Sequence, residues 1–151
     1  MRSVWFSLIG PSVSEVEQHL KQHGFMLADD GSPRANYPNG SDAVLYISWD
    51  DYEWVHKLDL QEEYAELVMA INGMTPTVHI FVDVSGRAKG DGEVRFLARC
   101  LLAKFTGFAF DDFLSYSHAW TLGEIESNVI VNGLGFFDYQ GHFDQSNKAS
   151  S

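Results

Sequence analysis

The stretch TPTVHIFVDVSG, residues 75–86, gives the clearest indication of the fold. Almost every residue in it is a good strand former, and apolar side chains alternate along it. The aliphatic members of this alternation share one face of the predicted strand: Val78, Ile80, Val82 and Val84. His79, Phe81 and Asp83 lie on the opposite face, and we interpret His79 as a half-buried structural histidine. The stretch therefore predicts a strand with one face in the core.

Further long elements flank this strand. Residues 4–9 and 43–49 have the β-rich composition of strands. Apolar residues at helical spacing predict helices over 50–73 and 92–107, and Gly107 is expected to end the second of these.

Residues 10–24 predict a helix with both of its ends marked. Ser12 and Glu15 have the spacing of a capping box, in which each side chain bonds the backbone N–H of the other residue. Gly24 is the expected C-terminal cap.

The remaining segments predict shorter elements. Residues 28–42 read as a long polar loop with a hairpin turn at PNG, residues 38–40. Residues 121–131 predict a short helix or turn that runs into an apolar stretch. The aromatic, glycine-rich residues 132–143 predict an edge strand or a docking tail.

The order of these elements predicts an α+β fold: a single-domain sandwich with helices packed on one face of a mostly antiparallel sheet. A parallel α/β arrangement is the alternative. The 151 residues are close to the commonest size of one domain. We expect that domain to span residues 1–145 and to be followed by a disordered tail over 146–151.

Charge and cysteine content restrict the function. Ten basic residues against 21 acidic ones give a net charge of −11, which disfavours binding to nucleic acid. No apolar run reaches the roughly 18 residues that a membrane span needs. The single cysteine, Cys100, lies in an apolar helical pattern and is interpreted as a buried small residue. These features predict a soluble, cytoplasmic protein.

The segment FDDFLSYSHAWTLGEIE, residues 110–126, contains a possible catalytic or metal-binding cluster. Asp111, Asp112 and His118 could share a proton or a metal ion. However, neighbouring residues in an extended chain point in different directions, and Thr121 with Glu124 forms a complete capping box. We therefore interpret the segment as a helix entry that also offers partner contacts.

Other candidate clusters lack a specific motif. Asp138, His142 and Asp144 are suitable divalent ligands but match no spaced metal motif. The loop over 86–92 follows a strand, but it has neither a P-loop nor a G-x-G-x-x-G pattern. No G-x-S-x-G elbow supports a nucleophilic serine. The sequence therefore predicts no catalytic residue, no metal site and no cofactor.

The strongest functional signal is a local concentration of acidic residues. Residues 41–72 contain eight acidic residues and one basic residue, a net charge of −7. Within a predicted helix, four carboxylates at a spacing of three or four form a stripe. The expected partner-binding residues are Asp50, Asp51, Tyr52, Glu53, Trp54, Asp59, Glu62, Glu63, Glu66, Asp111 and Asp112. Either this is a solvated helix face, or its carboxylates attract a basic partner while its aromatic side chains anchor it.

Small, acidic, cysteine-poor α+β chains with such patches resemble bacterial immunity proteins of contact-dependent and polymorphic toxin systems. The stretches that carry the resemblance are SWDDYEW (48–54), DLQEEYAE (59–66) and residues 110–126. The resemblance implies a non-enzymatic inhibitor that binds one cognate, basic toxin domain in the cytoplasm. Many such toxins are nucleases, so an acidic inhibitor can imitate the nucleic-acid backbone.

Two other functions remain open. One is a small enzyme with a pocket built from His79, Asp83, His118 and Asp138. The other is an adaptor domain that forms homodimers through the aromatic stretch GLGFFDYQGHF, residues 133–143.

Overall fold

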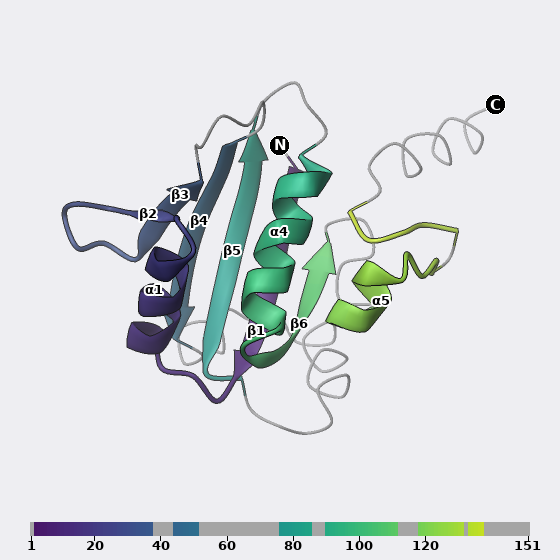
Figure 1. Cartoon of the computed structure of the whole chain (residues 1–151), viewed down its shortest axis with the longest axis horizontal. Helices are drawn as coiled ribbons and strands as arrows, with labels where there is room; N and C mark the ends of the chain where they lie inside the picture. The colour runs from purple at the N-terminus through teal and green to yellow at the C-terminus, as the bar shows by residue number, and fades with distance from the viewer. Residues whose placement is uncertain are drawn as a thin grey trace, which may run out of the picture.

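The computed structural model describes residues 2–37, 44–51, 76–85, 90–111, 118–131 and 133–137. Six strands in these ranges form one antiparallel sheet in the order β2-β3-β4-β5-β1-β6 (Figure 1). The strands are β1 (Arg2–Ile9), β2 (Met26–Leu27), β3 (Arg34–Tyr37), β4 (Val44–Asp51), β5 (Val78–Ser85) and β6 (Thr106–Asp111). The described helices are α1 (Val13–Gln22), α4 (Asp91–Leu102) and α5 (Leu122–Glu126).

Helices α1 and α4 lie over the same face of the sheet, and α5 lies beside the β6 edge (Figure 1). This arrangement confirms the predicted α+β fold with helices on one face. Every described strand pair is antiparallel, which excludes the parallel alternative. A hydrogen bond joins α4 to α5: Arg95 of α4 donates from Nη1 to the carbonyl oxygen of Ile125 in α5 at 2.7 Å.

The core fills the space between this sheet face and the two helices. The alternation predicted for β5 is confirmed, since Val78, Ile80, Val82 and Val84 are all buried. Their cross-strand partners on β1 and β4 are equally buried: Val4, Phe6, Leu8, Leu45, Ile47 and Trp49. Cys100 joins the same core, as expected, and burial raises the pKa of its thiol. His79 is more buried than predicted, with 2% of its surface exposed.

The predicted capping box of α1 is confirmed, whereas the C-cap residue is His23 and Gly24 is the residue that follows it. Ser12 Oγ accepts from the N–H of Glu15 at 3.2 Å, and Glu15 Oε1 accepts from the N–H of Ser12 at 3.3 Å. Gly24 adopts a φ of 86°, which favours glycine, and Phe25 N–H then bonds the carbonyl oxygen of Leu20.

The second long helix is shorter than predicted. Helix α4 ends at Leu102, and Gly107 lies in β6 instead of ending the helix. A Cβ atom on Gly107 would lie 2.3 Å from the carbonyl oxygen of Ser7 on β1. Gly107 is therefore required by the close approach of two strands, for which local sequence gives no signal.

The predicted polar loop over 28–42 contains a strand that the sequence analysis missed. Strand β3 pairs with both β2 and β4, and its Ala35 side chain is buried. The chain reverses between β2 and β3, within 28–33. The hairpin turn predicted at 38–40 lies outside the described residues.

Two other boundaries also differ from the prediction. Asp50 and Asp51 belong to β4 and not to a helix, while the rest of the helix predicted over 50–73 lies outside the described residues. Residues 133–137 form no edge strand: Leu134, Phe136 and Phe137 are buried in the core. Residues 133–137 therefore dock on the chain's own core, which agrees with the docking tail that was the alternative to an edge strand. The predicted tail over 146–151 is not among the described residues.

Candidate functional site

The predicted partner surface is only partly described. Asp50 and Asp51 form the last residues of β4, and Asp111 forms the last residue of β6. The remaining predicted contact residues lie outside the described ranges: Tyr52, Glu53, Trp54, Asp59, Glu62, Glu63, Glu66 and Asp112.

The described members occupy opposite ends of the sheet. Asp51 of β4 pairs with Val78 of β5, and Val78 pairs with Leu8 of β1. Leu8 in turn pairs with Gly107 of β6, and Asp111 is four residues further along that strand. Three strand spacings and four residue rises separate the two Cα atoms by about 20 Å. The structure therefore does not bring the two acidic groups into one tight cluster.

The ends of the acidic segment, in contrast, are close together. The chain leaves the sheet at Asp51 and returns at Val78, and these residues are direct cross-strand partners. Eight consecutive residue pairs hold β4 against β5. The acidic stretch that follows Asp51 is thus attached at both ends to the two central strands of the sheet, where β4 ends and β5 begins.

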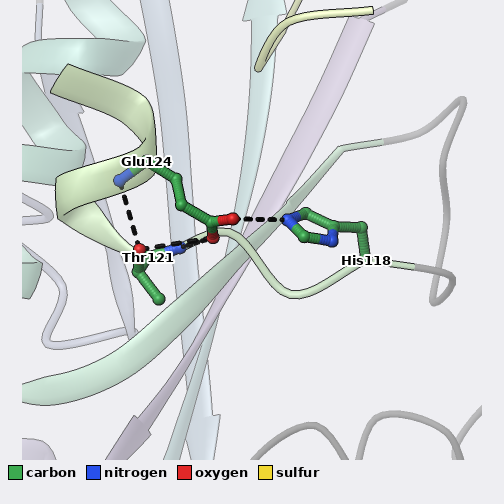
Figure 2. A network of polar contacts seen from close by, with 3 residues as sticks. All are labelled: His118, Thr121 and Glu124. Carbon is green, nitrogen blue, oxygen red and sulfur yellow. Dashed lines mark hydrogen bonds and ion pairs between the residues drawn. The ribbon is translucent and has the colours of Figure 1, made fainter. Parts of the chain in front are cut away.

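The structure assigns His118 to the entry of α5 (Figure 2). Glu124 Oε1 accepts from the N–H of Thr121 at 3.0 Å, and Thr121 Oγ1 accepts from the N–H of Glu124 at 3.2 Å, which confirms the predicted capping box. The second oxygen, Oε2, lies 3.2 Å from His118 Nε2. The imidazole also packs edge-on against Trp120, with ring centroids 4.6 Å apart. His118 is therefore oriented by the carboxylate of the helix cap.

Ser7 and His79 form a buried polar pair on the sheet face opposite α1 and α4. Ser7 Oγ lies within hydrogen-bonding distance of both ring nitrogens of His79, 3.4 Å from Nδ1 and 3.3 Å from Nε2. Burial lowers the pKa of His79 to about 4, which keeps the ring neutral at pH 7. Asp50 is the cross-strand partner of His79. Because Ser7 is fully buried, a substrate cannot reach the Ser7 hydroxyl group.

The three described residues of the alternative enzyme pocket, His79, Asp83 and His118, do not lie together. His79 and Asp83 share one face of β5, but four residues, or about 13 Å, separate them along the strand. His118 contacts Trp120, which bonds to Ala109 of β6, so β1 and β6 both lie between it and β5. Asp138 lies outside the described residues, as do His142 and Asp144. Within the described ranges, no group of three potential ligands could hold a metal ion.

The sheet carries an exposed apolar pair that the local sequence does not predict. Met26 and Tyr46 are 62% and 49% exposed, and Asn36 pairs with both of them across three strands. They lie on the sheet face opposite α1 and α4, since their neighbours Leu27 and Leu45 face the core. The alternation of exposed and core-facing side chains at these positions is visible in the sequence only after β2 and β3 have been recognised as strands.

Comparison of the chain with protein-family models, with curated proteins and with solved structures found no match. In the part of the chain that the structure describes, no helix is long and apolar enough to cross a bilayer.

Proposed function

We propose that this chain is an immunity-type protein, a non-enzymatic cytoplasmic inhibitor that binds a basic toxin domain through its acidic segment. The observation that carries the proposal is the attachment of this segment. Residues 52–77, which contain five acidic residues and one basic residue and so carry a net charge of −4, are joined to the sheet at the paired residues Asp51 and Val78. The paired strands β4 and β5 thus hold both ends of a segment whose sequence is rich in carboxylates and aromatic residues.

The charge supports rapid association with a basic partner. A surface of one sign raises the rate of encounter by roughly 10-fold to 1,000-fold at low salt. In this proposal the carboxylates of Glu62 and Glu63 attract the partner, while Tyr52 and Trp54 supply apolar anchors. Fixing both ends of the segment also limits the conformational entropy that binding would cost.

Asp111 contributes to the proposed interface only if that interface is broad. A standard interface buries about 800 Å² on each partner, which corresponds to a patch roughly 30 Å across. The separation of about 20 Å between Asp51 and Asp111 fits within such a patch. We therefore propose a place for Asp111 at the rim of the interface, where charges influence the association rate more than the final affinity.

The adaptor hypothesis loses part of its proposed dimer surface. Leu134, Phe136 and Phe137 are at most 4% exposed because they are buried in the chain's own core. These side chains are therefore not available for contact with a second copy.

The test compares two charge-reversal variants with equal net charge. Glu62→Lys/Glu63→Lys alters the proposed surface, whereas Asp29→Lys/Asp30→Lys alters two adjacent, exposed carboxylates in the connection between β2 and β3. The binding partner is first isolated from the producing cells with tagged protein, and its association rate is then measured by stopped flow over a salt series. We expect the first variant to slow association at least tenfold at low salt and to reduce its salt dependence, and the control to retain most of the rate.

The inhibitory role has its own readout. Co-expression with the isolated partner should rescue growth if that partner is a toxin. Equal rates for both variants, or a partner without toxicity, would reject the proposed inhibitor.

A further inference from the structure

Two histidines lie one helical turn apart at the C-terminal end of α1. His19 is in the last turn, and His23 is the C-cap residue. Their ring centroids are 4.3 Å apart, with an angle of 52° between the ring planes. Residues at this spacing share one face of a helix, and a histidine pair on one helix face is a common chelating unit for zinc.

The hydrogen bonds of both rings leave one nitrogen of each ring available as a ligand. His19 Nε2 lies 2.6 Å from the carbonyl oxygen of Cys100, and His23 Nδ1 lies 2.9 Å from the carbonyl oxygen of His19. A carbonyl oxygen only accepts, so these two nitrogens carry the protons. In the neutral rings, His19 Nδ1 and His23 Nε2 therefore hold the lone pairs.

This bonding pattern is the one that supports metal ligation. Metal-binding histidines almost always donate their second nitrogen to a carbonyl or a carboxylate, which fixes the tautomer and the ring orientation. Here the partner of His19 belongs to α4, so the ring is held between two helices. Phe105 contacts the same ring edge-on, with centroids 5.3 Å apart. His19 is thus held between two helices, whereas the exposed His23 is held only by its bond to the carbonyl oxygen of His19 within α1.

The surroundings of His19 leave room for further ligands. A surface hollow of about 300 Å³ adjoins the ring and is lined by Ser14, Glu15, Gln18, Gln22, Lys104 and Phe105. Carboxylate and amide oxygens line it together with one ammonium group, so the hollow itself supplies little net charge. His23 does not line this hollow but is itself exposed, so water reaches the histidine pair directly from the solvent.

We propose that His19 and His23 chelate a divalent transition metal ion, with water in the remaining coordination positions. Metal–nitrogen bonds of about 2.0–2.1 Å in tetrahedral geometry require the two nitrogens to lie about 3.3 Å apart. A tetrahedral chelate of this kind places the two ring centroids about 5 Å apart. From their present separation of 4.3 Å, the exposed ring of His23 must therefore move outward by about 1 Å when the metal binds. Imidazole pairs select zinc, copper and nickel over magnesium and calcium, so the ligand class is Zn²⁺ or Cu²⁺. This site is independent of the proposed inhibitory function.

The experiment titrates the full chain with ZnCl₂ and CuCl₂ by isothermal calorimetry, with MgCl₂ as the reference ion. The informative variant is His23→Gln, because His23 is exposed and its removal leaves the bond between His19 and α4 intact. His118→Gln is the matched control, since it removes one imidazole elsewhere. Nuclear magnetic resonance of the ring protons identifies which histidines respond first.

We expect binding of Zn²⁺ and Cu²⁺ without binding of Mg²⁺. His23→Gln should lower the affinity at least tenfold, and His118→Gln should leave it unchanged. The rings of His19 and His23 should shift first with Zn²⁺ and broaden first with Cu²⁺. Absence of binding by the wild-type chain, or equal affinity of the His23→Gln variant, would overturn the proposal, the latter because the metal would then be held by other residues.

Discussion

Acidification should destabilise this protein through His79. The side chain is 2% exposed, and burial lowers its pKa from 6.5 to about 4. In the unfolded chain the same imidazole is hydrated and takes up a proton near pH 6.5. Between pH 6.5 and pH 4 the unfolded state therefore binds more protons than the folded state.

The sign and the size of the effect follow from this difference. Stability is intact above pH 6.5, is lost as the pH falls towards 4, and does not change further through His79 below that value. A gap of about 2.5 between the two pKa values corresponds to about 3.4 kcal/mol in full. At pH 5 roughly 2 kcal/mol of this should already be lost relative to pH 7.5. For a domain stabilised by about 5–15 kcal/mol, that loss is readily measured.

The assay is urea unfolding, followed by tryptophan fluorescence, at pH 7.5 and pH 5.0. The wild-type chain is compared with His79→Leu, because leucine is apolar, is similar in size to histidine and cannot titrate. The loss of the Ser7 contact shifts both measurements of the variant equally, so it cancels in the difference. Titration of the carboxylates and of the other histidines cancels in the same way.

We expect the free energy of unfolding of the wild-type chain to fall by about 2 kcal/mol more than that of the variant when the pH is lowered from 7.5 to 5.0. An equal loss in both proteins would refute the assignment of a buried, neutral imidazole. If His79→Leu does not fold, a magnetic resonance titration of His79 in the wild-type chain gives the same test, and a pKa near 6.5 would be the contradicting result.

Substitutions at three other positions test the fold. Gly107→Ala should destabilise the chain by at least about 2 kcal/mol in urea unfolding, because its Cβ would collide with the backbone oxygen of Ser7. Gly92→Ala is its control: no heavy atom lies within 4 Å of that Cβ in α4, so the helix should be stabilised by about 0.4–1 kcal/mol. Thr121→Ala should cost about 1 kcal/mol in the same assay because the N–H of Glu124 loses its acceptor, and Thr121→Ser should restore most of that stability.

Local patterns in the sequence predict much of the fold. The alternation in β5 and the capping boxes at Ser12 and Thr121 were identified correctly, since each depends only on residues close together in the chain. Gly107 shows where this approach fails. A glycine after a helical pattern resembles a helix end, and only the approach of β1 reveals its actual role. Strand β3 was missed for a related reason, because four residues become a recognisable strand only when β2 and β4 pair with them.

Side-chain contacts within the candidate sites were harder to predict than the elements that carry them. The capping role of Glu124 was visible in the sequence, but its bond to His118 depends on how the chain enters α5. His19 and His23 have a spacing that is visible in the sequence. However, the carbonyl group that fixes the tautomer of His19 belongs to Cys100, 81 residues away. Spacing thus identifies the pair, whereas only the fold identifies the nitrogens that are free to bind.

The attachment of the acidic segment also explains how its charge can be tolerated. Like charges at helical spacing cost a few tenths of a kcal/mol per pair. In β4 and β5, which flank the segment, buried residues such as Ile47 pair with buried residues such as Val82 along the length of both strands. Burying one such aliphatic side chain contributes about 1.5–3 kcal/mol, which exceeds the cost of several repulsive pairs. Charge reversal at Glu62 and Glu63 should therefore change the association rate much more than the free energy of unfolding. A large change in stability with no change in rate would instead assign these carboxylates to the fold.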